Sequence, residues 1–224
     1  MRDDQFPLAG HSVRRMGFGA MQLPGPGVFG PPKDRDEAVC VLRRAVEAGV
    51  NHIDTAQFYG PDVANQLIHE ALFPYPDDLV LVSKVGASRD AARGFSAAQR
   101  PGELRAGVKA NLTSLELDQV PVVNLRRHPD AGARFEDQLG AMVMMRDEGL
   151  IGGIGLSNVS LEEDRWASAR IEVACVQNAY SVADRSAQAL FDACEADGVP
   201  FVPYFPLGSA FTADNPVLGA PEVI

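Results

Sequence analysis

The sequence predicts an α/β fold in which parallel strands close into a barrel, and three observations lead to this fold class. Segments typical of buried strands alternate with single amphipathic helices about every 20 to 40 residues, as expected of repeated βα units. The first strand is not followed by the GxGxxG pattern of a doubly wound dinucleotide-binding sheet. Polar residues close nearly every predicted strand, and in a barrel these positions converge on one mouth.

Composition and charge narrow the class of protein. The 224 residues are 46% hydrophobic and 22% charged, which suits one globular domain spanning 1–224. The formal net charge of −10 disfavours a nucleic-acid or anionic-membrane partner, because the protein would repel polyanions. No membrane-span-length apolar run and no secretion signal is visible, so we expect a soluble, cytoplasmic protein. Cys40, Cys175 and Cys194 lack CxxC spacing, which favours buried, reduced thiols, and no metal site is predicted.

The elements of the first half follow in chain order. A strand over 13–23 leads into a loop over 24–32 that is rich in proline and glycine. Asp34 followed three residues later by Glu37 has the spacing of a capping box, so a helix begins there. The next elements are a strand from Asn51, a helix with Pro61 in its first turn, a strand over 79–84 and a polar loop over 87–100.

The second half repeats the alternation of strands and helices. Ser160 with Glu163 again has the spacing of a capping box, and Gly198 ends the helix that contains Leu190 and Cys194. Strands are predicted over 120–126, 151–157, 173–177 and 199–204, with helices over about 104–115, 135–148, 160 onward and 187–198.

The stretch from Asn51 to Gly60 brings an acid and a phenol to one strand end. Asp54 ends the buried strand, and Tyr59 lies in the polar turn that follows. Lys84 closes the next strand, where an ammonium group is costly to bury unless a carboxylate or phenolate receives it. Each residue alone is more commonly a cap or a surface residue, but together Asp54, Tyr59 and Lys84 indicate one site.

With these residues in view, the chain resembles the aldo-keto reductase family from about Arg14 to its last residue. The segment Asp54-Thr55-Ala56-Gln57-Phe58-Tyr59-Gly60 matches the family motif D-x-A-x-x-Y-G, and Lys84 matches at the end of strand three. Later strand ends match at Gly155-Leu156-Ser157-Asn158, Gln177-Asn178 and Tyr204-Phe205-Pro206-Leu207-Gly208. Five matches in order at the right strand ends make the resemblance specific.

The resemblance implies a (β/α)8 TIM-barrel fold that reduces an aldehyde or ketone to an alcohol by hydride transfer from NADPH. Tyr59 would donate the proton, and Lys84, held by Asp54, would lower the phenol pKa from its ordinary value of ~10. Tyr204 would stack on the nicotinamide, while Ser157, Asn158 and Gln177 would bond its carboxamide. The implied cofactor-binding residues are Gly19, Ala20, Met21, Asp54, Ser157, Asn158, Gln177, Tyr204, Phe205, Leu207 and Gly208.

The sequence departs from the family at the end of strand four, where Arg126 stands in place of the usual histidine. A guanidinium donates hydrogen bonds but keeps its proton. We therefore hypothesise that Arg126 orients the substrate and favours a polar or anionic group on it. A similar arginine is found in a bacterial branch of the family that includes pyridoxal reductases.

The second departure is length, because the chain stops at Ile224 within a helix predicted from Pro216. We expect an incomplete barrel of about seven βα units, without the part that binds the adenosine and 2′-phosphate in the family. Its open edges would favour self-association, and the missing part would leave NADPH binding weak. The alternative function is a non-catalytic nucleotide-binding or regulatory module, which the changed strand-four residue favours and the intact Tyr59 and Lys84 disfavour. The substrate and the choice between NADPH and NADH stay open.

Overall fold

The computed structural model describes residues 5–90, 92, 94–128 and 132–206. Its centre is a curled parallel sheet in the order β10-β9-β8-β5-β4-β3. Isolated parallel bridges from Val176 to Phe201 and from Ala179 to Tyr204 continue the sheet beyond β10. The strands are β3 (Phe18–Gly19), β4 (His52–Asp54), β5 (Val80–Val85), β8 (Val120–Arg126), β9 (Ile151–Ser157) and β10 (Val176–Gln177).

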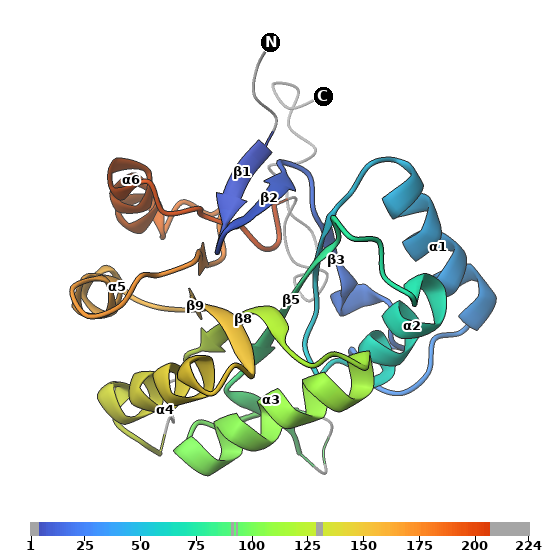
Figure 1. Cartoon of the computed structure of the whole chain (residues 1–224), viewed down its shortest axis with the longest axis horizontal. Coiled ribbons are helices and arrows are strands. Elements are labelled where there is room, and N and C mark those ends of the chain that lie inside the picture. Colours follow the sequence, from blue (N-terminus) through green and yellow to red (C-terminus); the bar gives the residue numbers. More distant parts are fainter. Residues whose placement is uncertain (1–4, 91, 93, 129–131, 207–224) are drawn as a thin grey trace.

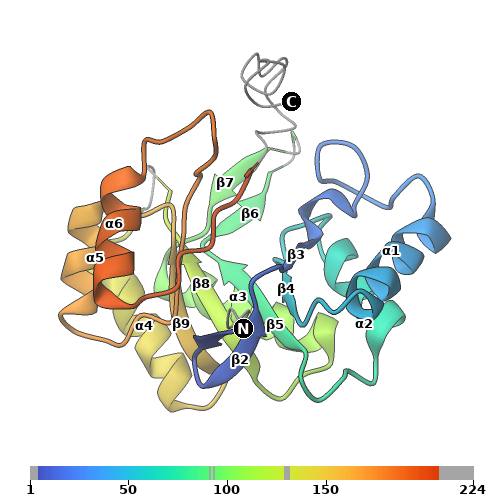
Figure 2. The ribbon, with the colours of Figure 1, turned by 90° about the horizontal axis from the view of Figure 1, so that it is seen from above.

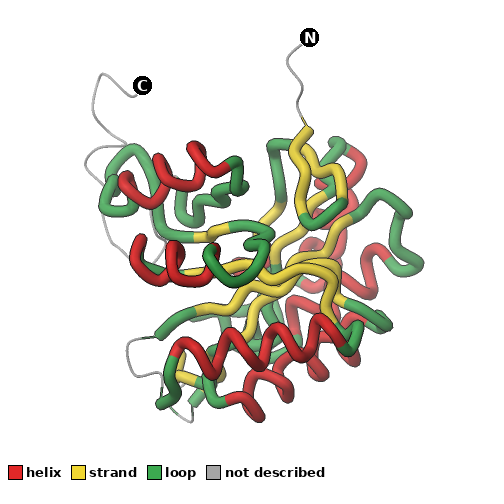
Figure 3. Tube along the Cα trace, turned by 60° about the vertical axis from the view of Figure 1, so that its left-hand side comes forward, coloured by secondary structure: helices red, strands yellow, loops and turns green. Residues whose placement is uncertain are grey.

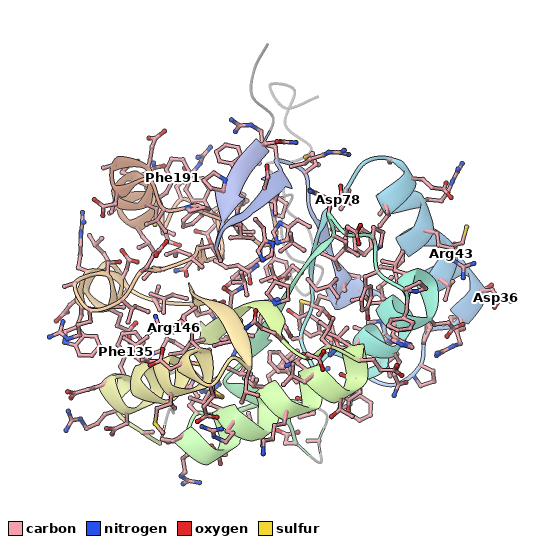
Figure 4. The ribbon with its side chains drawn as sticks, viewed as in Figure 1. Asp36, Arg43, Asp78, Phe135, Arg146 and Phe191 are labelled. Atoms are coloured by element: carbon pink, nitrogen blue, oxygen red, sulfur yellow. The ribbon has the colours of Figure 1, made fainter. Side chains whose placement is uncertain are left out.

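The helices form an arc around the outside of this sheet (Figure 1), and Figure 3 shows the strands enclosed by them. Charged side chains such as Asp36 and Arg43 stand on the outer face of the arc (Figure 4). Parallel strands inside and helices outside confirm the predicted TIM-barrel-type fold as a partial barrel. The helices are α1 (Arg35–Glu47), α2 (Val63–Leu72), α3 (Pro101–Leu115), α4 (Phe135–Asp147), α5 (Leu161–Ser168) and α6 (Gln188–Asp197).

Two antiparallel hairpins lie at opposite ends of the strands (Figure 2). The hairpin of β1 (Gln5–Leu8) and β2 (His11–Arg14) covers the amino-terminal ends, where Leu8 packs in one apolar cluster with Val80 and Val82 of β5. The hairpin of β6 (Ala87–Arg89) and β7 (Phe95–Ala97) follows the carboxyl end of β5. The sheet is therefore sealed by apolar side chains at one end and carries its polar strand ends at the other.

The capping signals in the sequence are confirmed. The Asp34 carboxylate accepts a hydrogen bond from the Glu37 amide at the start of α1. At the start of α5, Ser160 and Glu163 make both bonds of a capping box. Such caps each stabilise a helix by about 1 kcal/mol, because they satisfy amides that the first turn leaves unpaired.

Several predicted elements differ from those observed. The strand predicted over 13–23 is wrong as one strand, since the chain passes from β2 to the short β3 and a 3-10 turn at Ala20–Gln22. The region predicted as a polar loop over 87–100 contains the β6–β7 hairpin, whose polar strands include a hydrogen bond between the Ser88 and Ser96 hydroxyls. Hydrophobic alternation missed this hairpin because its strands are only three residues each and carry a single large apolar side chain, Phe95.

Other corrections concern element ends. Pro61 precedes α2, whose N-cap is Asp62, and the strand predicted over 173–177 is reduced to β10. The strand predicted over 199–204 appears as the two bridges at Phe201 and Tyr204. Cys40 is exposed, contrary to its predicted burial, whereas Cys175 and Cys194 are buried.

Some predictions lie beyond what the structure describes. Leu207, Gly208 and the helix predicted from Pro216 fall outside the described residues. Within the described part of the chain, no helix is long and apolar enough to cross a membrane. A single domain over 1–224 and self-association through an open edge stay predictions.

Candidate active site

The carboxyl ends of β4, β5 and β10 bring three predicted residues into one hydrogen-bonded cluster. The Lys84 Nζ atom lies 2.6 Å from Asp54 Oδ2 and donates to the Thr55 carbonyl at 3.0 Å. Gln177 Nε2 donates to the other carboxylate oxygen, Asp54 Oδ1, at 3.1 Å. Lys84 is only 5% exposed, so the charge that was predicted to need a carboxylate partner has one.

Tyr59 lies beside this cluster. Its amide donates to the Ala56 carbonyl at 3.0 Å, which holds the turn between β4 and α2, and its side chain is 6% exposed. The Lys84 Nζ atom is 5.0 Å from the centroid of the Tyr59 ring. The structure therefore places Asp54, Tyr59 and Lys84 together, although Tyr59 is separated from Lys84 by 25 positions in the chain (84 − 59).

The pKa values of the phenol and the ammonium respond differently to burial. Burial raises the pKa of Tyr59 above its ordinary value and outweighs the opposing effect of Lys84 and Arg126. Lys84 lowers the pKa of Tyr59, as predicted, but the net shift of the Tyr59 pKa is upward. Burial lowers the pKa of Lys84, yet its interactions with Asp54 and Tyr59 raise it more, so the net direction is also upward. At neutral pH the phenol keeps its proton and the ammonium keeps its charge.

A buried polar network supports the cluster from behind. Thr55 Oγ1 donates to Asn65 Oδ1 at 2.8 Å, Asn65 Nδ2 donates to Asn111 Oδ1 at 2.9 Å, and Ser83 Oγ donates to the same oxygen at 2.5 Å. All four side chains are fully buried. Since Thr55 and Ser83 adjoin Asp54 and Lys84, the network joins the site to α2 and α3. Sequence reasoning missed it, although an asparagine on the apolar face of each helix was an available signal.

Arg126 and Arg127 at the end of β8 point in different directions, as alternation along a strand requires. Arg127 donates to Glu163 at 2.8 Å and to Gln138 at 2.7 Å. Arg126 acts electrostatically on both Tyr59 and Tyr204, lowering their pKa values against the larger effect of burial, which raises both. Its Nη1 atom is buried and has no hydrogen-bond partner in the described part of the chain. The predicted replacement for the histidine thus faces the site.

The remaining predicted residues that the structure describes lie around the same mouth. Gly19 is paired in register with Asp54, Ala20 is fully buried, and Met21 is half-buried in the turn that follows. These three residues belong to the strand end next to β4. Their placement is compatible with the predicted contact to a bound molecule above Asp54.

On the other side of the mouth, Ser157 is buried at the end of β9, and Asn158 adopts a left-handed conformation with φ of 58°. The Tyr204 hydroxyl donates to Asn158 Oδ1 at 2.6 Å. The Phe205 ring lies edge-on to Tyr204, with 5.0 Å between centroids. Gln177 Oε1 is buried and has no hydrogen-bond partner among the described residues.

A cavity of about 620 Å³ lies at the opposite end of the strands. Its lining comes from the β1–β2 hairpin, the ends of α5 and α6, and the segments that enter the last strands, and it includes Pro7, Arg165, Asp197 and Pro200. None of the predicted site residues lines it. The candidate site is therefore defined by its hydrogen-bonded cluster at the mouth and not by this cavity.

Comparison with known proteins agrees with this arrangement. The model described as the Aldo/keto reductase family matches residues 15–221. The chain belongs to the aldo/keto reductase family, whose members are oxidoreductases.

Individual relatives give the same result. The chain is 48% identical over 213 residues to a protein named Pyridoxine 4-dehydrogenase from Escherichia coli (strain K12), covering 93% of this chain and 74% of that protein. A glycerol dehydrogenase from Gluconobacter oxydans superposes with a TM-score of 0.82 at 21% identity, covering 96% of this chain and 69% of the other. An aldo/keto reductase from Klebsiella pneumoniae, solved with NADP and acetate, gives 0.72 at 24% identity, with coverage of 91% and 68%. These two structures show the shared fold.

Proposed function

We propose that the chain reduces an aldehyde or ketone to an alcohol with NADPH, with Tyr59 as the proton donor to the carbonyl oxygen. The observation that carries the proposal is the buried Lys84 ammonium, bonded to Asp54 at 2.6 Å and lying 5.0 Å from the Tyr59 ring centroid. Family membership supports the reaction class. The alternative of a non-catalytic module is not favoured, because the groups needed for proton transfer are present and assembled.

The strand ends fit the nicotinamide part of the cofactor. Gln177 Oε1 and Asn124 Nδ2 are buried without hydrogen-bond partners among the described residues, so this region has an acceptor and a donor to spare. A carboxamide could satisfy groups of both kinds. Gln177, Ser157 and Asn158 would hold the carboxamide, and Tyr204 would lie against the ring.

NADPH supplies a hydride when bound, and the Klebsiella pneumoniae relative solved with NADP supports this choice of cofactor. The other residues assigned to the cofactor in this proposal are Gly19, Ala20, Met21, Asp54, Phe205, Leu207 and Gly208. The described ones, Gly19, Ala20, Met21, Asp54 and Phe205, lie at or just after neighbouring strand ends and would extend the contact beyond the nicotinamide, whereas Leu207 and Gly208 lie outside the described residues.

The protein's own groups handle the proton. As negative charge develops on the carbonyl oxygen, the Tyr59 hydroxyl would give it a proton and become a phenolate. Lys84 would stabilise that phenolate, because its ammonium is already desolvated and oriented by Asp54. Arg126 adds a second positive charge near the same oxygen. A phenol whose pKa is raised by burial stays protonated until this step.

Substituting Tyr59→Phe tests the proposal. Removing the hydroxyl should reduce turnover of NADPH with a panel of aldehydes by about 10²- to 10⁴-fold, with cofactor binding by fluorescence quenching nearly unchanged. Tyr75→Phe is the matched control, because that hydroxyl bonds the Leu115 carbonyl away from the site. Wild-type turnover in Tyr59→Phe would contradict the proposal.

Pyridoxal is the first substrate that we propose to assay. The relative of 48% identity is named Pyridoxine 4-dehydrogenase, and Arg126 offers a fixed positive charge for the ionised ring hydroxyl of such a substrate. Arg126→Ala should lower kcat/KM for pyridoxal by about tenfold or more, as expected for loss of a hydrogen bond to a charged group. An unchanged kcat/KM for every carbonyl tested would remove Arg126 from the mechanism.

A further inference from the structure

The β6–β7 hairpin carries a second arginine to the barrel mouth. The guanidinium carbon of Arg89 lies 3.8 Å from the centroid of the Phe95 ring and 5.7 Å from that of Phe29. The guanidinium carbon of Arg126 lies 6.0 Å from the same Phe95 centroid. Two cationic side chains from different elements therefore share one aromatic ring.

This pair is connected to the proton donor by aromatic contacts. Phe58 meets Phe95 edge-on at 6.0 Å and meets Tyr59 edge-on at 5.3 Å. Phe29 is bridged to Gly60, the residue after Tyr59. The hairpin and the 24–32 loop thus contribute to the same side of the site as the turn that holds Tyr59.

The charge on both arginines is incompletely matched. Arg89 Nε and Arg126 Nη1 are each buried without a hydrogen-bond partner in the described part of the chain. Asp90 is the acid that acts on Arg89, but one of its oxygens is engaged by the Gly94 amide. Asp54 is engaged by Lys84 and Gln177.

The contrast with Arg127 is informative, since its guanidinium is bonded to Glu163, Gln138 and Gln99. An arginine with that many partners has little left to offer a ligand. Arg89 and Arg126 retain N–H groups, and a guanidinium is suited to planar oxyanions because it can donate two parallel hydrogen bonds.

We propose that Arg89 and Arg126 together bind an anionic oxygen substituent of the substrate, while Phe29 and Phe95 contact its ring and the buried Phe58 packs behind Phe95. The inference rests on the proposed function and deepens it by naming the substrate class. That class is an aromatic aldehyde or ketone that carries a carboxylate, phosphate or phenolate. Arg89 then determines specificity from an element that sequence analysis assigned to a loop.

Arg89 also donates to the carbonyls of Gly27 and Val28, so a purely structural role has to be separated from a binding role. The substrates formylbenzoate and its methyl ester make this separation, because they differ in charge and share the reacting group. Arg89→Lys keeps the charge, and Arg89→Gln removes it. Arg44→Gln, at an exposed position on α1, is the control for the change in net charge.

Steady-state reduction of both aldehydes should show a wild-type preference for formylbenzoate. Arg89→Gln should raise KM for formylbenzoate by about tenfold or more, with kcat and the constants for the ester within about twofold. Arg89→Lys should retain part of the preference, and Arg44→Gln all of it. Equal losses for acid and ester in Arg89→Gln, or no loss for either, would overturn the proposal.

Calorimetric titration of the cofactor-free chain with formylbenzoate keeps this test independent of turnover. Formylbenzoate should bind more weakly to Arg89→Gln than to the wild type, while the methyl ester should bind equally to both proteins. That result supports the arginine pair even if neither aldehyde is reduced. Absent turnover in the wild type would count against the proposed function alone. Identical binding of formylbenzoate to wild type and Arg89→Gln would reject the arginine pair alone.

Discussion

The two ends of β5 present opposite chemistry on the same face of one strand. Val80 and Val82 lie near the base, where they pack with Leu8 and Val13 of the β1–β2 hairpin. Lys84, two residues further along, is bonded to Asp54 at the mouth. The base has an apolar layer under the hairpin, whereas the mouth holds the buried Lys84–Asp54 ion pair and unpartnered polar atoms of Arg126 and Gln177. We therefore propose that stability depends mainly on one end of the barrel and chemistry on the other.

Lys84→Met, at the mouth, should have the largest effect, because it should lower both turnover and stability. Turnover should fall by about 10²-fold or more, because the phenolate left by Tyr59 loses its positive partner. Stability should also fall by about 3–5 kcal/mol, since Asp54 is left without its ion-pair partner. Urea unfolding and NADPH oxidation measure the two effects. The double variant Asp54→Asn with Lys84→Met should regain stability but not turnover, and regained turnover would contradict the assignment.

At the base, Leu8→Ala should lower the free energy of unfolding by about 2–5 kcal/mol, because the side chain is 1% exposed and its loss leaves a cavity. Its kcat, measured below the unfolding transition, should match the wild type. Chemical denaturation and initial rates are the measurements. A tenfold fall in kcat with unchanged stability would show that the ends are not separate.

The buried network behind the site should affect both stability and turnover, because its side chains are buried and two of them adjoin the site. Asn111→Ala would remove the acceptor of the Ser83 hydroxyl and one of the two acceptors of Asn65 Nδ2, at a cost of about 1–3 kcal/mol of stability. A smaller fall in kcat should accompany it, since Thr55 and Ser83 adjoin Asp54 and Lys84. Thermal unfolding with initial rates measures both effects. Ser114→Ala is the milder control, because Ser114 accepts from Asn65 but makes no bond to Ser83 or Thr55.

The smallest effect concerns thiol ionisation. Burial raises the pKa of Cys175, at the base, to about 12 from an ordinary value of 9.0, and raises that of Cys194 also to about 12. A raised folded-state pKa contributes stability below pH 9, and this contribution is lost as pH rises toward about 12. In the native protein at pH 8 to 9, iodoacetamide should label the exposed Cys40 and spare the other two. Mass spectrometry would show this, and labelling of Cys175 before unfolding would contradict it.

Local patterns predicted much of the fold. The strands over 120–126 and 151–157 are observed with the predicted bounds, because a run of apolar residues between turn signals suffices to define a buried strand. The caps at Asp34 and Ser160 were equally local, since donor and acceptor lie three residues apart. The β6–β7 hairpin was missed because its three-residue strands are too short to show such a pattern.

The sequence by itself determined that Asp54, Tyr59 and Lys84 end or follow neighbouring parallel strands, because motif spacing and strand periodicity act over a few residues. Only the tertiary structure decided that Gln177 bonds Asp54 from 123 positions away, that burial gives Tyr59 a net upward pKa shift, and that Arg89 shares a ring with Arg126. Desolvation and long-range pairing depend on which distant segments cover a group, and that information exists only once the chain has folded.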